Sequence, residues 1–153
     1  MALVKTILNS HTVEYDDTEF EVLKEAKNVY LHYVGDGSNI TNPKGNTSCY
    51  RMFEDFEGTN LDLSKFNTSE ITNMSFMFAN CCNLKSLNLF SFNTNKITDM
   101  DNMFYDCINL ETLKVGSDYL QFFSINRALL DIGNNVNIIP VTKIDRTIED
   151  LFY

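Results

Sequence analysis

Residues 61–86 read LDLSKFNTSEITNMSFMFANCCNLKS, and residues 87–112, LNLFSFNTNKITDMDNMFYDCINLET, follow them at once in the same register. The period is 26 residues. Apolar and polar types agree over most of the unit, and the matched identical residues are Leu61/Leu87, Leu63/Leu89, Phe66/Phe92, Asn67/Asn93, Thr68/Thr94, Ile71/Ile97, Thr72/Thr98, Met74/Met100, Met77/Met103, Phe78/Phe104, Cys81/Cys107, Asn83/Asn109 and Leu84/Leu110. Agreement at one fixed offset predicts a tandem structural repeat.

The repeat extends weakly beyond these two units. Leu113-Lys-Val115 opens another unit, and residues 46–53 resemble residues 71–78 at an offset of 25. The chain therefore holds about two complete units and one degenerate unit. Because repeat arrays need covered ends, we expect the flanking segments to act as caps.

Each unit begins with alternating apolar and polar residues, which is typical of a strand with one buried face. Leu-Asp-Leu, Leu-Asn-Leu and Leu-Lys-Val recur at the repeat spacing, so we expect them to form a short parallel sheet. The residues between the apolar ones, Asp62, Asn88 and Lys114, should then form an exposed ladder on the sheet.

The second half of each unit predicts a short helix. Apolar residues occur at i, i+3, i+4 and i+7, which places them on one helical face: Met74, Met77, Phe78 and Cys81, then Met100, Met103, Phe104 and Cys107. Asn73 and Asp99 precede these runs and are good helix N-caps. We favour core packing for the apolar stripe over a partner groove. Asn83 and Asn109 should hydrogen-bond the backbone at the following turn.

The motif LDLSKFNTSEITNMSFMFANCCNLKSLNL resembles the BspA-like leucine-rich repeats of bacterial surface proteins, and the likeness covers about residues 46–115. The resemblance implies a solenoid used for adhesion or protein binding, without enzymatic activity. The expected fold class is therefore α/β, a short leucine-rich-repeat-like solenoid with parallel strands and short helices. A small N-terminal β-sheet and a C-terminal helix should cap it.

The flanks complete a single predicted domain, residues 1–153, with an N-terminal cap (1–45), repeats (46–115) and a C-terminal cap (116–153). Strands are expected at 3–8, 11–15, 29–34 and 136–141, and residues 20–26 suit either a short helix or a strand. Helices are expected at 118–131 and 144–152. Residues 35–45 are dense in turn formers; a plain loop is favoured there over a calcium site, although Asp36 and Asn39 are suitable ligand types.

Charge excludes some classes of partner. The chain has 21 acidic and 12 basic residues and a formal net charge of −9. We therefore expect no direct binding to nucleic acid or to anionic membranes. No segment reaches the roughly 20 apolar residues of a membrane span, and no secretory leader is recognisable, which favours the cytoplasm.

Neither metal binding nor catalysis is indicated by the residue types. The four cysteines, Cys49, Cys81, Cys82 and Cys107, lack the paired spacing of a zinc site and are expected to be reduced. His11 and His32 fall on predicted strands and suit half-exposed positions better than a catalytic role. With 6 glycines and no phosphate-binding motif, we predict no enzyme activity, no cofactor and no metal.

The acidic residues are the most informative candidates for a function. Two clusters and one residue of the predicted sheet form the candidate partner-binding set: Glu14, Asp16, Asp17, Glu19, Glu21, Glu25, Glu54, Asp55, Glu57 and Asp62. The plain alternative is a solvated surface.

If these residues do bind, they predict a non-enzymatic module that docks on a basic surface of a protein partner. The sharper hypothesis is an inhibitor of a nucleic-acid-binding defence enzyme, similar to the anti-CRISPR proteins of phages and acting in the host cytoplasm. The alternatives are a fragment of a bacterial BspA-like surface adhesin and a structural homo-oligomer such as a homodimer.

Overall fold

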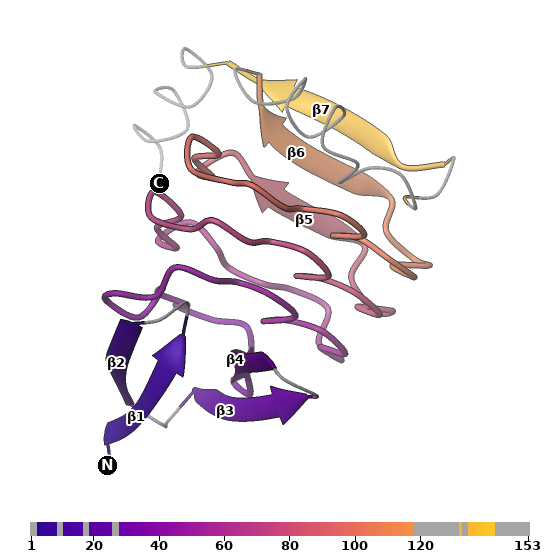
Figure 1. Ribbon diagram of the computed structural model, residues 1–153. Helices are drawn as coiled ribbons and strands as arrows, with labels where there is room; N and C mark the ends of the chain where they lie inside the picture. Colours follow the sequence, from indigo (N-terminus) through magenta and orange to yellow (C-terminus); the bar gives the residue numbers. More distant parts are fainter. Residues whose placement is uncertain are drawn as a thin grey trace.

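The computed structural model describes residues 3–8, 11–16, 19–25, 28–117, 132 and 135–142. Two antiparallel hairpins open the chain and a three-stranded parallel sheet lies at the opposite end, with stacked turns between them (Figure 1). The hairpins pair β1 (Leu3–Leu8) with β2 (His11–Asp16) and β3 (Phe20–Glu25) with β4 (Asn28–Tyr33). The parallel sheet has the order β5 (Ser86–Leu89), β6 (Thr112–Gly116), β7 (Asn137–Val141).

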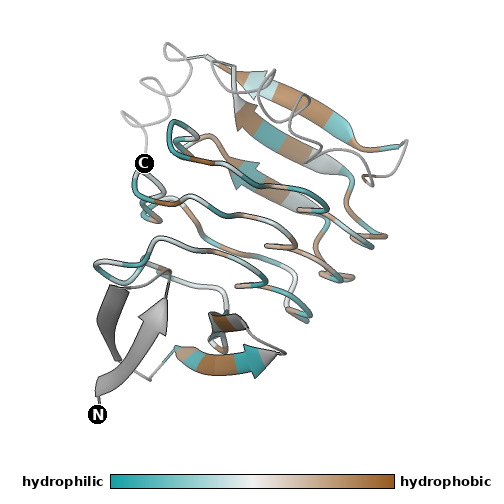
Figure 2. Cartoon of the chain, viewed as in Figure 1, coloured by the Kyte–Doolittle hydropathy of each residue, from teal (hydrophilic) through white to brown (hydrophobic). Residues whose placement is uncertain are grey.

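The strands follow the sequence pattern closely. Those predicted at 3–8, 11–15, 29–34 and 136–141 are confirmed within one residue at each end, and residues 20–25 form a strand rather than a helix. In β5, Leu87 and Leu89 are buried while Ser86 and Asn88 are exposed. Figure 2 shows the corresponding alternation of hydropathy along this sheet.

The predicted α/β class is wrong. In the part of the chain that the structure describes, residues 74–81 and 100–107 form turns, and no α-helix is present. The prediction of a leucine-rich-repeat-like solenoid of strands and short helices is therefore also wrong. In place of one N-terminal sheet there are two separate hairpins. The helices predicted at 118–131 and 144–152 lie outside the described residues.

The backbone of the turn at 74–81 explains why a helix does not form. Phe76 has φ 54° and Asn80 has φ 59°, whereas helical residues have φ of about −63°. The N–H groups also alternate between two destinations. That of Phe78 donates to the carbonyl of Met103 in the next repeat (2.9 Å), and that of Ala79 returns to the carbonyl of Phe76 (3.1 Å). Half of the turn's donors therefore bind the neighbouring repeat.

The residues predicted as helix caps have a related local role. The Asn73 side-chain oxygen accepts from the Ser75 N–H at 2.8 Å, and that of Asp99 accepts from the Asp101 N–H at 3.0 Å. These i to i+2 bonds are Asx turns. Asn73 also bridges to Asp99 in the parallel sense, so the two turns begin in register.

The predicted apolar stripe is buried although it is not helical. The aromatic rings of successive repeats are stacked: Phe53 on Phe78 at 5.6 Å and Phe78 on Phe104 at 5.8 Å between ring centroids, with planes 8° and 6° apart. Met74 and Met100 are equally buried beside them. The core is thus one continuous column, and these side chains are not a partner groove.

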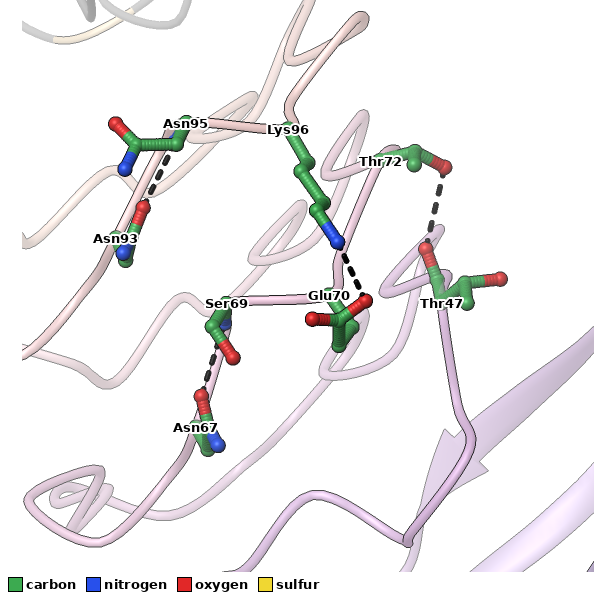
Figure 3. A network of polar contacts seen from close by, with 8 residues as sticks. All are labelled: Thr47, Asn67, Ser69, Glu70, Thr72, Asn93, Asn95 and Lys96. Atoms are coloured by element: carbon green, nitrogen blue, oxygen red, sulfur yellow. Dashed lines mark hydrogen bonds and ion pairs between the residues drawn. The ribbon is translucent and has the colours of Figure 1, made fainter.

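Polar side chains support the same stacking on another side of the repeats (Figure 3). Thr72 donates to the carbonyl of Thr47 (3.3 Å), and Thr98 donates to that of Thr72 (3.1 Å). Lys96 and Glu70 form an exposed ion pair across two repeats at 2.7 Å. Because these bonds join equivalent positions, they fix the register between neighbouring units.

The predicted ladder of Asp62, Asn88 and Lys114 is only partly formed. Asn88 pairs with Lys114 in the sheet. The Asp62 N–H instead donates to the carbonyl of Gly37 at 2.7 Å, so residues 61–63 bind the preceding loop and do not form a strand. Asn83 and Asn109 do bind backbone, but not at the following turn as predicted: their amides donate to carbonyls one repeat earlier.

Candidate binding surface

The predicted acidic residues that the structure describes lie on β2, on the hairpin of β3 and β4 with the residue before it, and in residues 54–62. Side chains are described for Glu19, Glu21, Glu54, Asp55, Glu57 and Asp62. Glu14 and Asp16 belong to β2 and Glu25 to β3, where only the backbone is described, and Asp17 lies outside the described residues.

The hairpin of β3 and β4 docks directly on the first turn of the repeats. The Tyr33 N–H donates to the carbonyl of Met52 at 2.7 Å, and the Tyr33 ring packs on Phe53 and Phe56 with centroids 5.3 and 6.1 Å away. The Val34 N–H donates to the carbonyl of Glu19 at 2.7 Å. Two acidic stretches that are far apart in sequence are thereby brought to one end of the molecule.

A shallow hollow of about 400 Å³ lies where the hairpin meets the turn. Three carboxylate residues line it, Asp36, Asp55 and Glu57, together with the ring of Phe56 and the imidazole of His32. Asp55 and Glu57 are exposed, and His32 is half-exposed, as predicted for a strand residue. We call Asp36, Asp55 and Glu57 the acidic rim.

Asp36 is the member of this rim that the sequence argument did not select. The sequence indicates a plain loop for its segment, with a calcium site as the weaker alternative. The Asp36 carboxylate accepts bonds from the N–H (2.9 Å) and hydroxyl (2.5 Å) of Ser38. These bonds hold the pKa of Asp36 below its ordinary value of 3.8, so it is ionised at neutral pH. Its position three residues after the end of β4 was the available signal.

The loop that carries Asp36 is held by the backbone of Gly37. Its N–H donates to the Tyr33 hydroxyl at 2.7 Å. Gly37 has φ 95°, and a Cβ there would lie 2.1 Å from the carbonyl oxygen of Asn60. Glycine is therefore required at this position on two grounds, conformation and close approach.

The electrostatic effect of the carboxylates reaches the buried Tyr33. Its pKa is raised above 10.0 chiefly by burial, partly offset by the bond from the Gly37 N–H, and raised further by the negative charges of Glu19 and Asp36. Tyr33 therefore stays neutral at physiological pH.

Four predicted residues with described side chains do not line this hollow: Glu19, Glu21, Glu54 and Asp62. Glu54 forms an ion pair with Arg51, whose guanidinium stacks 4.5 Å above the Phe76 ring. Asp62 lines a separate hollow of about 220 Å³ with Asn88 and Phe90. The predicted set is therefore not one continuous surface.

The chemistry available at the rim is attraction of positive charge. Among the side chains that the structure describes, no group of three His, Cys, Asp or Glu is arranged to hold a metal ion. Ionised carboxylates beside an aromatic ring suit an ammonium or guanidinium group, through charge-assisted hydrogen bonds and ring contact. We therefore treat the rim as the candidate contact for a basic partner.

Comparison with known proteins adds a family likeness for the repeats. Residues 47–119 match DUF285. This family is described as a Mycoplasma protein of unknown function. The match supports the BspA-like resemblance in its coarser form, since DUF285 is related to such repeats. Neither a curated protein nor a solved structure matches the chain. Within the described residues, no helix has the length and apolar content of a membrane span.

Proposed function

We propose that this protein is a non-enzymatic binding module whose acidic rim docks on a basic surface of another protein. The observation that carries the proposal is the convergence of Asp36, Asp55 and Glu57 around one hollow. They come from two segments that are separate in sequence. Hydrogen bonding preorganises Asp36, and preorganised groups lose less conformational entropy on binding.

Long-range charge supports the same proposal. The net charge of −9 favours encounter with positively charged proteins and disfavours nucleic acid and anionic lipid. Binding of this kind should weaken steeply between low and physiological salt, because the Debye length falls to about 8 Å at 0.15 M. The sharper form of the proposal is occupation of the basic channel of a nucleic-acid-binding defence enzyme in the cytoplasm. Charge alone supports that form.

The test compares two variants of equal net charge. The rim variant carries Asp36→Asn, Asp55→Asn and Glu57→Gln. The control carries Glu70→Gln, Asp106→Asn and Glu111→Gln, which are exposed residues on other parts of the repeats. Both lose three negative charges. They differ in where the charge is removed and in the loss of the Glu70–Lys96 ion pair, which is exposed and contributes little to stability.

Partners are captured from bacterial lysate at low salt and identified by mass spectrometry. We expect wild type and the control to capture the same basic protein, and the rim variant to capture at least tenfold less. Equal loss in both variants would show that only net charge matters and would contradict a defined rim. For the sharper form, the captured protein should lose DNA binding when the wild-type chain is added.

The family likeness favours a second candidate, a fragment of a surface adhesin with BspA-like leucine-rich repeats. The match over residues 47–119 supports it, because the BspA-like resemblance implies adhesion. This candidate predicts that the native protein is labelled by a membrane-impermeant reagent on intact cells. A structural homo-oligomer predicts instead a dimer mass in light scattering of the purified chain.

A further inference from the structure

Cys81 and Cys107 occupy the same position in successive repeats and have matching surroundings. The Cys81 thiol donates to the carbonyl of Phe53 at 3.1 Å, and the Cys107 thiol donates to that of Phe78 at 3.0 Å. Both side chains are buried, with exposed fractions of 0% and 7%. Two equivalent thiols therefore lie one above the other in the core column.

The spacing between the two turns that carry Cys81 and Cys107 suits a covalent link between them. The Asn80 N–H, just before Cys81, donates to the carbonyl of Tyr105 at 2.7 Å, so the two turns are hydrogen-bonded neighbours. Backbone segments that are hydrogen-bonded side by side lie about 4.8 Å apart. Disulfides join Cα atoms that are roughly 4.4–6.8 Å apart. Both side chains belong to the same buried core.

We propose that Cys81 and Cys107 are an oxidant-sensitive pair, which hydrogen peroxide converts to a disulfide that ties one repeat to the next. In the first step, the Cys107 thiolate attacks one peroxide oxygen, the O–O bond breaks and hydroxide leaves. Cys107 is then a sulfenic acid. Cys81 attacks the Cys107 sulfur, and the hydroxyl leaves with the Cys81 proton as water. Two thiols and one peroxide thus give one disulfide and two waters.

The surroundings of the two thiols assign their order of reaction. The neighbouring Cys81 side chain lowers the pKa of Cys107, whereas the Cys107 side chain, together with burial, raises the pKa of Cys81. Cys107 also keeps the greater exposure. The attacking group should be the more thiolate-like and accessible sulfur. Cys107 is therefore the peroxide-reactive residue and Cys81 the resolving residue.

The other two cysteines provide internal controls. Complete burial raises the pKa of Cys49, which makes its thiol unreactive. Cys82 is half-exposed, and its sulfur lies 3.8 Å from the carbonyl of Asp106. Because Cys82 is adjacent to Cys81, it is the main competitor for the link, and Cys82→Ser is the matched control variant.

The test treats the reduced full-length chain with hydrogen peroxide, blocks remaining thiols and maps tryptic peptides. Cleavage after Lys85 and Lys96 separates the cysteines of interest. We expect a monomeric product that has lost two hydrogen atoms, with Cys81 linked to Cys107, and a reductant-reversible rise in Tm of about 5–10 °C. Cys82→Ser should keep the link, whereas Cys81→Ser and Cys107→Ser should lose it.

Several results would overturn the proposal: a link through Cys82, a link between chains, oxidation of Cys107 only to sulfinic or sulfonic acid, or no reaction. If a serine substitution in the core prevents folding, Cys82→Ser still decides the question. In that variant, a link between the two tryptic peptides can come only from Cys81 and Cys107.

Discussion

The ring of Phe78 lies parallel to that of Phe104, with centroids 5.8 Å apart and planes 6° apart, and Phe53 continues the stack on the other side. These residues are equivalent in successive repeats. The stack therefore shows directly that neighbouring units have the same internal structure. It also places the largest apolar surfaces of the chain in one column, where burial contributes most to stability.

Replacement of Phe78 by alanine should destabilise the protein by about 3–5 kcal/mol, because it removes a fully buried ring from the middle of the stack. Chemical denaturation of the purified variant measures the loss. Ile108→Ala is the control, since Ile108 is 72% exposed, and it should change stability by no more than about 0.5 kcal/mol. A similar effect of both substitutions would contradict the buried stack.

Asn102 provides a test of the turn against the predicted helix. It has φ 57°, a conformation that costs alanine about 1–2 kcal/mol but costs glycine little. We therefore expect Asn102→Gly to be more stable than Asn102→Ala. An α-helix would reverse this order by about 1 kcal/mol in favour of alanine. Thermal unfolding of the two variants side by side measures the order.

Thr68 joins two repeats through both functions of its hydroxyl group. It donates to the carbonyl of Asn93 (2.9 Å) and accepts from the Asn93 N–H (2.7 Å), while it is almost completely buried. Thr68→Val should cost about 2 kcal/mol, because it leaves buried polar groups without a partner. Thr68→Ser keeps the hydroxyl and should recover most of the loss in urea denaturation. Equal losses would assign the effect to packing.

Asp62 should make stability depend on acid pH. Bonds from the Ser64 hydroxyl (2.7 Å) and N–H (3.1 Å) lower its pKa below 3.8. Since the folded pKa is below the unfolded value, this stabilisation is complete above the unfolded pKa. It is lost as the pH falls through the folded pKa. Ser64→Ala should raise the Asp62 pKa in a carboxyl NMR titration. An unchanged titration would contradict these bonds.

Much of the local structure could be predicted because it depends on residue pattern. Alternation in 86–89 and the apolar residues of 136–141 indicated the strands, and the equivalence of Met74 with Met100 indicated the buried column. The spacing of Met74, Met77, Phe78 and Cys81 misled the helix prediction. Two consecutive tight turns bury apolar residues at the same spacing as a helix does. Apolar periodicity therefore does not distinguish the turns from a helix.

The sequence alone determined the repeat, its 26-residue period and the identity of its core residues, because apolar side chains at a fixed offset must be buried together. Tertiary structure decided which backbone conformation buries them. Hydrogen bonds between units, such as Phe78 to Met103, satisfy donors that a helix would keep within itself. The tertiary structure also decided that Asp36 lies beside the same hollow as Asp55 and Glu57, because their proximity depends on the docking of β4 against the first turn.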